Sequence, residues 1–554
     1  MFLGLDVGGT FTDGVVITAG KMVSKVKTPT THENLLQCIL TVVDKVVEEI
    51  GSKTFERIAL STTIVTNALI EDNIDQVGLC IMPGPGMNTK EALPVEPYIL
   101  SGYIDHRGRE TAQPRQEEVM AACRHFLACD CDVFAVSGKF AVRNPNHELT
   151  VAKWLKQDAN PVHTSIGAEV SGSLNFLRRT NSAYYNGAVW RRFNNFASAV
   201  EKALTDRGIH GPVYVLKADG GTLPLAIARK YPVEAIFTGP AASVLGIMAM
   251  NSTNIPGISL DIGGTTTDIA LWQHGAPLFA QQGARVAGYA TAVRAFRLKS
   301  VGIGGDSFVR LENSEIKVGP MRLGSAMAVG GPKPTVTDAM VVAGLIDFGN
   351  RQLAVEAMRQ LALAKQSPEE VANLVLDEAV MCICQSITGI LTEQAAEPVY
   401  RVEDIVHGTG LRVEQIIGVG GAAAGLVPLV AKKMGVTYEL PHDGMVANAV
   451  GAAAARPTLD ITLRADTAEG YYTVAELGIK NRLPSMHFSL HDAYQLAEKH
   501  LAQLAKDSDI LLGETEMIQS EEFNVIRGFS TVGKIMTCRF QVKPGVLWQS
   551  KERL

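Results

Sequence analysis

The chain of 554 residues lacks the features that mark several large classes of protein. It has no run of lysine or arginine and a formal net charge of -6, which argues against a nucleic-acid partner. Its longest apolar stretches are interrupted by glycine, proline or charge well short of roughly 18 residues, so no transmembrane helix is predicted. The first apolar stretch has no basic segment before it and already contains Asp6. This pattern predicts a cytoplasmic protein without a secretory signal.

Cysteine is scarce, and its spacing does not match common metal or redox motifs. The chain has 8 cysteines, and the only close pairs are Cys129 with Cys131 and Cys382 with Cys384. Neither pair has the C-x-x-C spacing of a zinc or redox site, so we expect buried free thiols. The chain also lacks the G-x-x-x-x-G-K-S/T sequence of a Walker A loop. Its length is too great for one hydrophobic core, so two or three domains are expected.

The chain does contain one short sequence twice. Residues 6–13 read D-V-G-G-T-F-T-D and residues 261–268 read D-I-G-G-T-T-T-D. Each copy predicts a strand, a tight turn and a second strand. Paired glycines tolerate positive φ and let backbone N–H groups approach an anion, while threonine hydroxyls add donors. The residues that we expect to bind phosphate are Gly8, Gly9, Thr10, Thr12, Asp13, Gly263, Gly264, Thr265, Thr266, Thr267 and Asp268.

An aspartate ends the first strand of each copy, at Asp6 and Asp261. A phosphate repels a neighbouring carboxylate unless a divalent cation lies between them, so these two aspartates predict a Mg²⁺ site. One copy alone is equally well explained as an ordinary β-hairpin with common turn residues. The duplication favours a functional interpretation, because two unrelated turns need not share their acids and hydroxyls.

Two such hairpins facing each other would hold an oligophosphate from both sides, and this arrangement resembles the superfamily of actin, sugar kinases and Hsp70. The resemblance implies two actin-like (ribonuclease H-like) α/β domains around an ATP cleft, with a small α+β segment after them. The glycine-rich residues 416–421 take the place of the superfamily's adenosine motif, with Gly418, Gly420 and Gly421 near the nucleoside. The catalytic residues that follow from this resemblance are Asp6, Asp261, Thr12 and Thr266.

Three further segments resemble the hydantoinase A/oxoprolinase family. They are S-T-T-I-V-T-N-A-L at residues 61–69, T-G-P-A-A-S at residues 238–243 and P-T-V-T-D-A at residues 334–339. The small residues of the second segment predict a helix that packs closely at a hinge between domains. The resemblance covers roughly residues 1 to 456 and implies domains at 1–170, 171–456 and 457–554.

The family resemblance also implies candidate substrate residues. These are Thr62, Thr63, Asn67 and Asp338. An aspartate at a helix N-cap explains Asp338 equally well. The chain departs from the family's G-x-G-G-G-S sequence at Asp306, where either a ligand has been added or part of an anion nest has been lost.

The resemblance implies that ATP phosphorylates the oxygen of a cyclic amide, such as 5-oxoproline or a hydantoin, and that water then opens the ring. It also implies a B-type hydantoinase/oxoprolinase subunit for the hydrolytic step, and hence a homo- or hetero-oligomer. Three alternatives remain open: a small-molecule kinase, the A-type subunit of a related ATP-dependent carboxylase, and a nucleotide-dependent reactivase. The expected partners include neither nucleic acid nor membrane.

Overall fold

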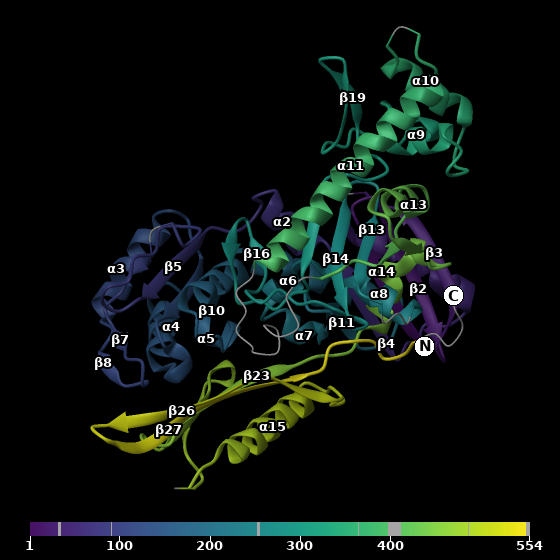
Figure 1. Ribbon diagram of the computed structural model, residues 1–554. Helices are drawn as coiled ribbons and strands as arrows, with labels where there is room; N and C mark the ends of the chain where they lie inside the picture. Colours follow the sequence, from purple (N-terminus) through teal and green to yellow (C-terminus); the bar gives the residue numbers. More distant parts are fainter. Residues whose placement is uncertain are drawn as a thin grey trace.

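Two α/β domains form the centre of the computed structural model, a lobe projects above them and a further domain lies below (Figure 1). The structure describes residues 1–31, 35–89, 91–251, 255–363, 365–396, 411–485 and 487–549.

The first hairpin belongs to a six-stranded sheet. Its elements and the helices beside it are β1 (Phe2–Val7), β2 (Phe11–Thr18), β3 (Lys21–Pro29), β4 (Arg57–Thr62), β11 (Val213–Leu216), β12 (Thr222–Pro224), α1 (Leu35–Ile50) and α6 (Phe176–Asp206). β1 pairs antiparallel with β2 and parallel with β4, and the strand order is β12-β11-β4-β1-β2-β3. Leu3, Leu5 and Val7 are buried because α1 and α6 add apolar side chains to the same core.

The second hairpin begins a sheet with the same central order. Its strands are β13 (Gly257–Ile262), β14 (Thr267–Gln273), β15 (Ala276–Pro277), β18 (Leu298–Val301), β21 (Gln415–Val419) and β22 (Thr437–Glu439). The order β18-β14-β13-β21-β22 repeats the order β3-β2-β1-β4-β11 of the first sheet. The predicted pair of actin-like α/β domains is therefore confirmed in its topology.

The first sheet is completed only after residue 170, where the family resemblance places the end of the first domain. From β4 the chain passes through α2 (Ile64–Ile70) into an inserted subdomain, and it returns to the first sheet only at β11. The insertion, at the left of Figure 1, has the strand order β10-β9-β5-β6. Its elements are β5 (Val77–Met82), β6 (Tyr98–Ile99), α3 (Gln116–Leu127), β9 (Val133–Gly138), α4 (Asn146–Asp158) and β10 (His163–Ile166). Parallel strands need a long crossover, and here that crossover holds a whole subdomain.

A lobe of the second domain projects at the top of Figure 1. Its elements are β19 (Val309–Glu312), β20 (Glu315–Val318), α9 (Val336–Val342), α10 (Arg351–Leu361) and α11 (Pro368–Ala395). Contrary to the prediction from the sequence, α11 is long and apolar enough to cross a membrane, with a mean hydropathy of 1.6 in its most apolar window. Buried core helices pass the same test, and Val375, Ala379 and Ile383 of α11 lie in the core of this domain.

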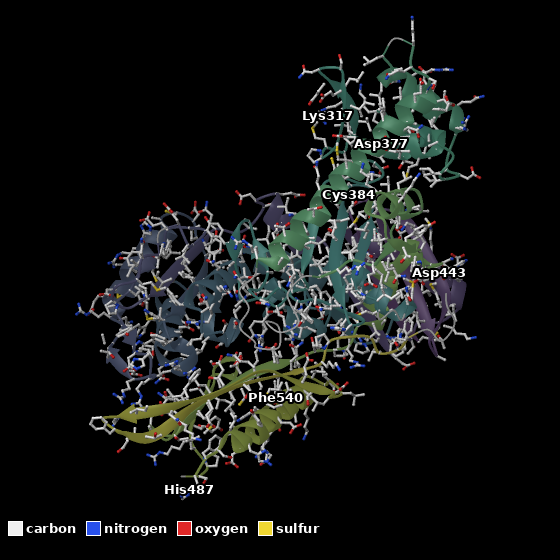
Figure 2. The ribbon with its side chains drawn as sticks, in the orientation of Figure 1. Lys317, Asp377, Cys384, Asp443, His487 and Phe540 are labelled. Atoms are coloured by element: carbon white, nitrogen blue, oxygen red, sulfur yellow. The ribbon has the colours of Figure 1, made fainter. Side chains whose placement is uncertain are left out.

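All eight cysteines are free thiols. Five of them are buried, at Cys38, Cys80, Cys123, Cys131 and Cys538. Cys129 is exposed, and Cys382 and Cys384 are half-buried on α11, where Figure 2 labels Cys384. The prediction of buried free thiols is thus confirmed for most of them.

The C-terminal residues form an α+β domain, as predicted. Its elements are β23 (Asp460–Asp466), β24 (Tyr471–Val474), β25 (Ile479–Arg482), α15 (Leu490–Asp507), β26 (Thr515–Arg527) and β27 (Ser530–Val542). The sheet has the order β25-β24-β23-β27-β26 and lies below the central domains in Figure 1. Leu501 of α15 packs in the same core as Ile461 and Leu463 of β23, so the helix covers one face of the sheet.

Two helices cross between the central sheets with almost no side chain between them. They are α8 (Thr238–Met250) and α14 (Ala447–Ala454). A Cβ on Gly246 would lie 2.0 Å from the carbonyl oxygen of Ala447, and a Cβ on Gly451 would lie 1.9 Å from that of Ala242. The predicted close packing of small residues between the domains is confirmed.

Candidate active site

The two hairpins carry their aspartates in equivalent positions. Asp6 lies opposite Asp13 on the β1–β2 ladder, and Asp261 lies opposite Asp268 on the β13–β14 ladder. Residues directly opposite on antiparallel strands point to the same face. Each hairpin therefore presents two carboxylates on one side, beside a turn closed by a backbone hydrogen bond of 3.0 Å.

Gly264 allows the two hairpins to lie close together. A Cβ on Gly264 would lie 2.8 Å from Thr10 Oγ1 and 3.0 Å from Asp306 Oδ2. The turn glycines Gly8, Gly9, Gly263 and Gly264 all lack positive φ. None of them uses the positive φ that glycine tolerates, and at Gly264 the missing side chain is what the close approach requires.

A cavity of about 620 Å³ lies between the two hairpins. Both actin-like domains contribute to its wall, and its size suits a nucleotide. The sequence-predicted residues that line it are Asp6, Gly8, Gly9, Thr10, Asp13, Thr63, Asp261, Gly263, Gly264, Thr265, Thr266, Asp268, Gly420 and Gly421.

Part of the cavity wall is apolar. Met340, Ile346 and Phe348 contribute from the lobe, and Met445 contributes from the segment before α14. Gly420 has φ +95°, and a Cβ there would lie 2.6 Å from Asp261 Oδ1. The predicted adenosine motif therefore passes close to the carboxylates and beside a wall that suits an apolar ring system.

Three carboxylates of the cleft have strongly raised pKa values. Burial raises the pKa of Asp6 to about 7 and that of Asp268 to about 6. Burial also raises the pKa of Asp261 to about 8, and the neighbouring Asp268 carboxylate adds to this rise. Hydrogen bonding by the Asn448 side chain opposes the rise at both Asp6 and Asp261. One oxygen of Asp6, Oδ1, is buried and has no hydrogen-bond partner.

The two hairpins differ in how their outer aspartates are neutralised. Lys27 Nζ lies 2.8 and 2.7 Å from the two carboxylate oxygens of Asp13. The residue opposite Asp268 on β18 is Ser300, which hydrogen-bonds to this carboxylate without a charge. Among the described residues, no lysine or arginine forms an ion pair with Asp6, Asp261 or Asp268.

A divalent cation fits this arrangement, because the unpaired carboxylates and the unpartnered oxygen of Asp6 face one cavity. Within the described part of the chain, no three His, Cys, Asp or Glu side chains are grouped closely enough to hold a metal. Mg²⁺ would therefore take Asp6 and Asp261 together with phosphate and water oxygens, which is its common coordination at phosphate sites.

Thr12 and Thr267 occupy equivalent positions and lie away from the cavity. Both are fully buried. Thr12 Oγ1 lies 2.9 Å from Thr30 Oγ1, and Thr267 Oγ1 donates to the carbonyl oxygen of Ile303 at 2.7 Å. Side chains alternate along a strand, so the residue before each outer aspartate faces the opposite side. The structure corrects the predictions that both threonines bind phosphate and that Thr12 is catalytic.

Gly418, Thr62 and Asn67 do not line the cavity either. A Cβ on Gly418 would lie 2.5 Å from the Val427 side chain, so this glycine permits helix packing behind the motif. The backbone N–H of Thr62 donates to Thr238 Oγ1 at 3.1 Å. Asn67 Nδ2 donates to Thr63 Oγ1 at 3.3 Å, and Thr63 itself lines the cavity.

Asp338 is a structural residue. Its carboxylate accepts hydrogen bonds from the backbone N–H groups of Met327, Ala328 and Thr335 at 2.7 to 3.1 Å. Thr335 is the N-cap of α9, and Asp338 completes the capping box three residues later. The prediction of a substrate contact at Asp338 is corrected, and the helix-capping explanation applies.

Sequence reasoning missed Lys27 and Asn448. Asn448 is the polar side chain of the otherwise apolar helix A-N-A-V-G-A-A-A, which is a detectable signal. Lys27 has no local signal, because only the β2–β3 register places it opposite Asp13.

The structure distinguishes the roles of two neighbouring threonines. Thr266 lines the cavity, so Thr266→Val removes a donor to a charged phosphate and should lower ATP turnover by about 10- to 100-fold. Steady-state phosphate release measures this effect. Thr267→Val is the matched control, because it should lower the melting temperature and leave turnover per folded molecule nearly unchanged. Equal turnover losses in both variants would contradict this assignment.

Duplicated hairpins, duplicated sheets and a shared cavity define an actin-like ATPase-type fold. The solved structures of acetone carboxylase (TM-score 0.73, 17% identity) and of the ATP-dependent caprolactamase from Pseudomonas jessenii (TM-score 0.71, 20% identity) share this fold. They match 99% and 97% of this chain, and 88% and 87% of their own.

The sequence then places the chain in one family within this class. The model of the hydantoinase/oxoprolinase family matches residues 179–461, and that of the hydantoinase/oxoprolinase N-terminal region matches residues 2–158. The chain belongs to the hydantoinase/oxoprolinase family. It is 26% identical to caprolactamase subunit alpha of Pseudomonas jessenii over 78% of this chain and 67% of the relative. It is 25% identical to the acetophenone carboxylase gamma subunit of Aromatoleum aromaticum over 76% of this chain and 63% of the relative.

Proposed function

We propose that this chain uses ATP to phosphorylate the oxygen of a cyclic amide, which activates the ring for opening by water. The observation that carries the proposal is the pair of carboxylate-bearing turns that line one cavity. Membership of the hydantoinase/oxoprolinase family, with ATP-dependent relatives that process lactams, supports the choice of substrate class.

In this proposal the turns hold the phosphates, and Thr10, Thr265 and Thr266 add hydroxyl donors from both sides. Asp6 and Asp261 hold Mg²⁺, which when bound neutralises phosphate charge. An unstrained amide is a poor electrophile, and phosphorylation turns its oxygen into a leaving group. The protein's contribution is chiefly positioning and charge stabilisation.

A partner subunit is part of the proposal. The chain spans 67% of caprolactamase subunit alpha and 63% of the acetophenone carboxylase gamma subunit, and both names denote subunits of larger enzymes. We propose that a B-type hydantoinase/oxoprolinase subunit completes the hydrolytic step in a hetero-oligomer. The proposed location is the cytoplasm, where ATP is available.

The proposal predicts that cyclic amides stimulate ATP turnover, because closure on both ligands assembles the site. We expect 5-oxoproline, hydantoins or larger lactams to raise phosphate release at least about tenfold over the basal rate, which corresponds to ~1.4 kcal/mol. Phosphate release is measured with the chain alone and with its partner. Stimulation by bicarbonate and a ketone would instead support the carboxylase alternative. A stable phosphorylated product would support the kinase, and no stimulation by any small molecule would support the reactivase.

A further inference from the structure

Asp306 is fixed to the second hairpin by its backbone. Its N–H donates to the carbonyl oxygen of Gly264 at 2.6 Å, and the N–H of Gly305 donates to that of Gly263 at 2.9 Å. These bonds hold the loop after β18 directly on the turn, and Asp306 lines the cavity there. The departure from the family's glycine at this position therefore places a carboxylate beside the proposed phosphate site.

Arg322 engages only one oxygen of this carboxylate. Its Nε and Nη2 donate to Asp306 Oδ2 at 3.1 and 3.0 Å. No described residue donates a hydrogen bond to the other oxygen, Oδ1. The Asp306 side chain is 14% exposed and lines the cavity, and Oδ1 does not belong to the buried polar atoms that lack a partner, so this oxygen is open to a ligand or to water. Arg322 thus orients the carboxylate and leaves Oδ1 able to accept a hydrogen bond from a ligand.

A carboxylate in this position is a poor phosphate ligand, because the two anions repel each other. The same turn brings Thr10 Oγ1 close to Asp306 Oδ2, since both lie within 3.0 Å of a Cβ built on Gly264. Asp306 is therefore next to the point where the two hairpins meet and where a terminal phosphate would react. A ligand whose attacking oxygen has an N–H next to it could donate that N–H to Asp306 while the oxygen approaches the phosphate. A secondary amide is such a group.

We propose that Asp306, oriented by Arg322, accepts the N–H of a cyclic amide while the amide oxygen attacks the terminal phosphate. The inference rests on the proposed function and narrows its substrates to rings with an unsubstituted amide nitrogen. The amide oxygen forms a bond to phosphorus, the bond from phosphorus to the bridging oxygen breaks, and its electron pair leaves with ADP. The nitrogen gains positive charge and keeps its proton, which is shared with Asp306. Hydrogen bonds between charged groups are the stronger ones, so this contact strengthens as the reaction proceeds.

The test compares each stimulating lactam with its N-methyl derivative in a single-turnover measurement of ADP formation, which does not depend on the hydrolytic step. The unaltered chain should prefer the N–H ring by about 10- to 100-fold in kcat/KM. In Asp306→Asn the ratio of kcat/KM for the N–H ring to that for the N-methyl ring should fall to about threefold or less. The fall should come mainly from a lower rate with the N–H ring. The affinity for MgATP, measured by calorimetry, should stay unchanged.

Glu312→Gln is the matched control, because it also removes one negative charge and one arginine ion pair, at 2.7 Å from Arg310, outside the cavity. It should retain the N–H preference. The inference is overturned if the unaltered chain uses both rings equally, if Asp306→Asn retains the preference, or if this variant loses activity with both rings in proportion. Failure of every lactam to stimulate the unaltered chain would instead overturn the proposed function itself.

Discussion

Asp261→Asn is expected to lower ATP turnover by about 100- to 1,000-fold, which is the scale of losing one stabilising group at a reacting phosphate or acyl centre. Asp261 lines the cavity between the two hairpins, and no described cation pairs with it. The variant should also lose Mg²⁺-dependent ATP affinity, which calorimetry with and without the metal measures. The control is Asp44→Asn, which removes a surface carboxylate paired with Arg207. Unchanged MgATP binding in Asp261→Asn would exclude the cleft carboxylates as metal ligands.

The same substitution should stabilise the ligand-free protein at alkaline pH. Burial raises the pKa of Asp261 to about 8, so the folded protein holds this proton more tightly than the unfolded chain does. The stability that this group contributes is complete at pH values below the ordinary carboxyl pKa and is lost as pH rises toward 8. The advantage of Asp261→Asn should therefore grow between pH 5 and pH 8, to roughly 4 °C or more in melting temperature, and level off above pH 8. A constant difference across this range would contradict the raised pKa.

Gly451→Val is expected to cause the largest loss of stability, about 4 kcal/mol or more. A Cβ at this position would lie 1.9 Å from the carbonyl oxygen of Ala242 and 2.6 Å from the backbone nitrogen of Gly246. Both are backbone atoms of α8, so the whole helix must move. Urea unfolding and the yield of folded protein measure the effect. Gly513→Val is the control, because its Cβ would meet only the Val542 side chain at an ordinary 3.6 Å.

The hairpins could be predicted because their information is local. An acid, two glycines and hydroxyls within eight residues define a turn wherever they occur, and the repeat at residues 261–268 identified their shared role. The roles of Thr12 and Thr267 were predicted wrongly although the information was present. Each precedes an aspartate that faces the cleft, and strand alternation alone turns its side chain to the opposite face.

The remaining site residues depend on contacts between distant parts of the chain. Asn448 lies far from both Asp6 and Asp261 in sequence, and the packing of α14 against β1 and α8 brings it to them. The strands that complete the first sheet could not be predicted from the sequence for the same reason. Local patterns show that residues 213–216 form a strand, whereas its pairing with β4 across an inserted subdomain follows only from the assembled sheet.

The contrast between Lys27 and Ser300 has a kinetic consequence. Among the described residues, a counter-charge pairs with only one of the two outer aspartates of the cleft, so the ligand-free cavity carries excess negative charge once Asp268 is ionised. Nucleotide without its metal brings further negative charge toward these carboxylates. In the magnesium complex, the cation offsets part of the nucleotide's negative charge. Under the proposed function, the cleft would therefore select its nucleotide by net charge as well as by shape, and excess free ATP should be a weak competitor of MgATP.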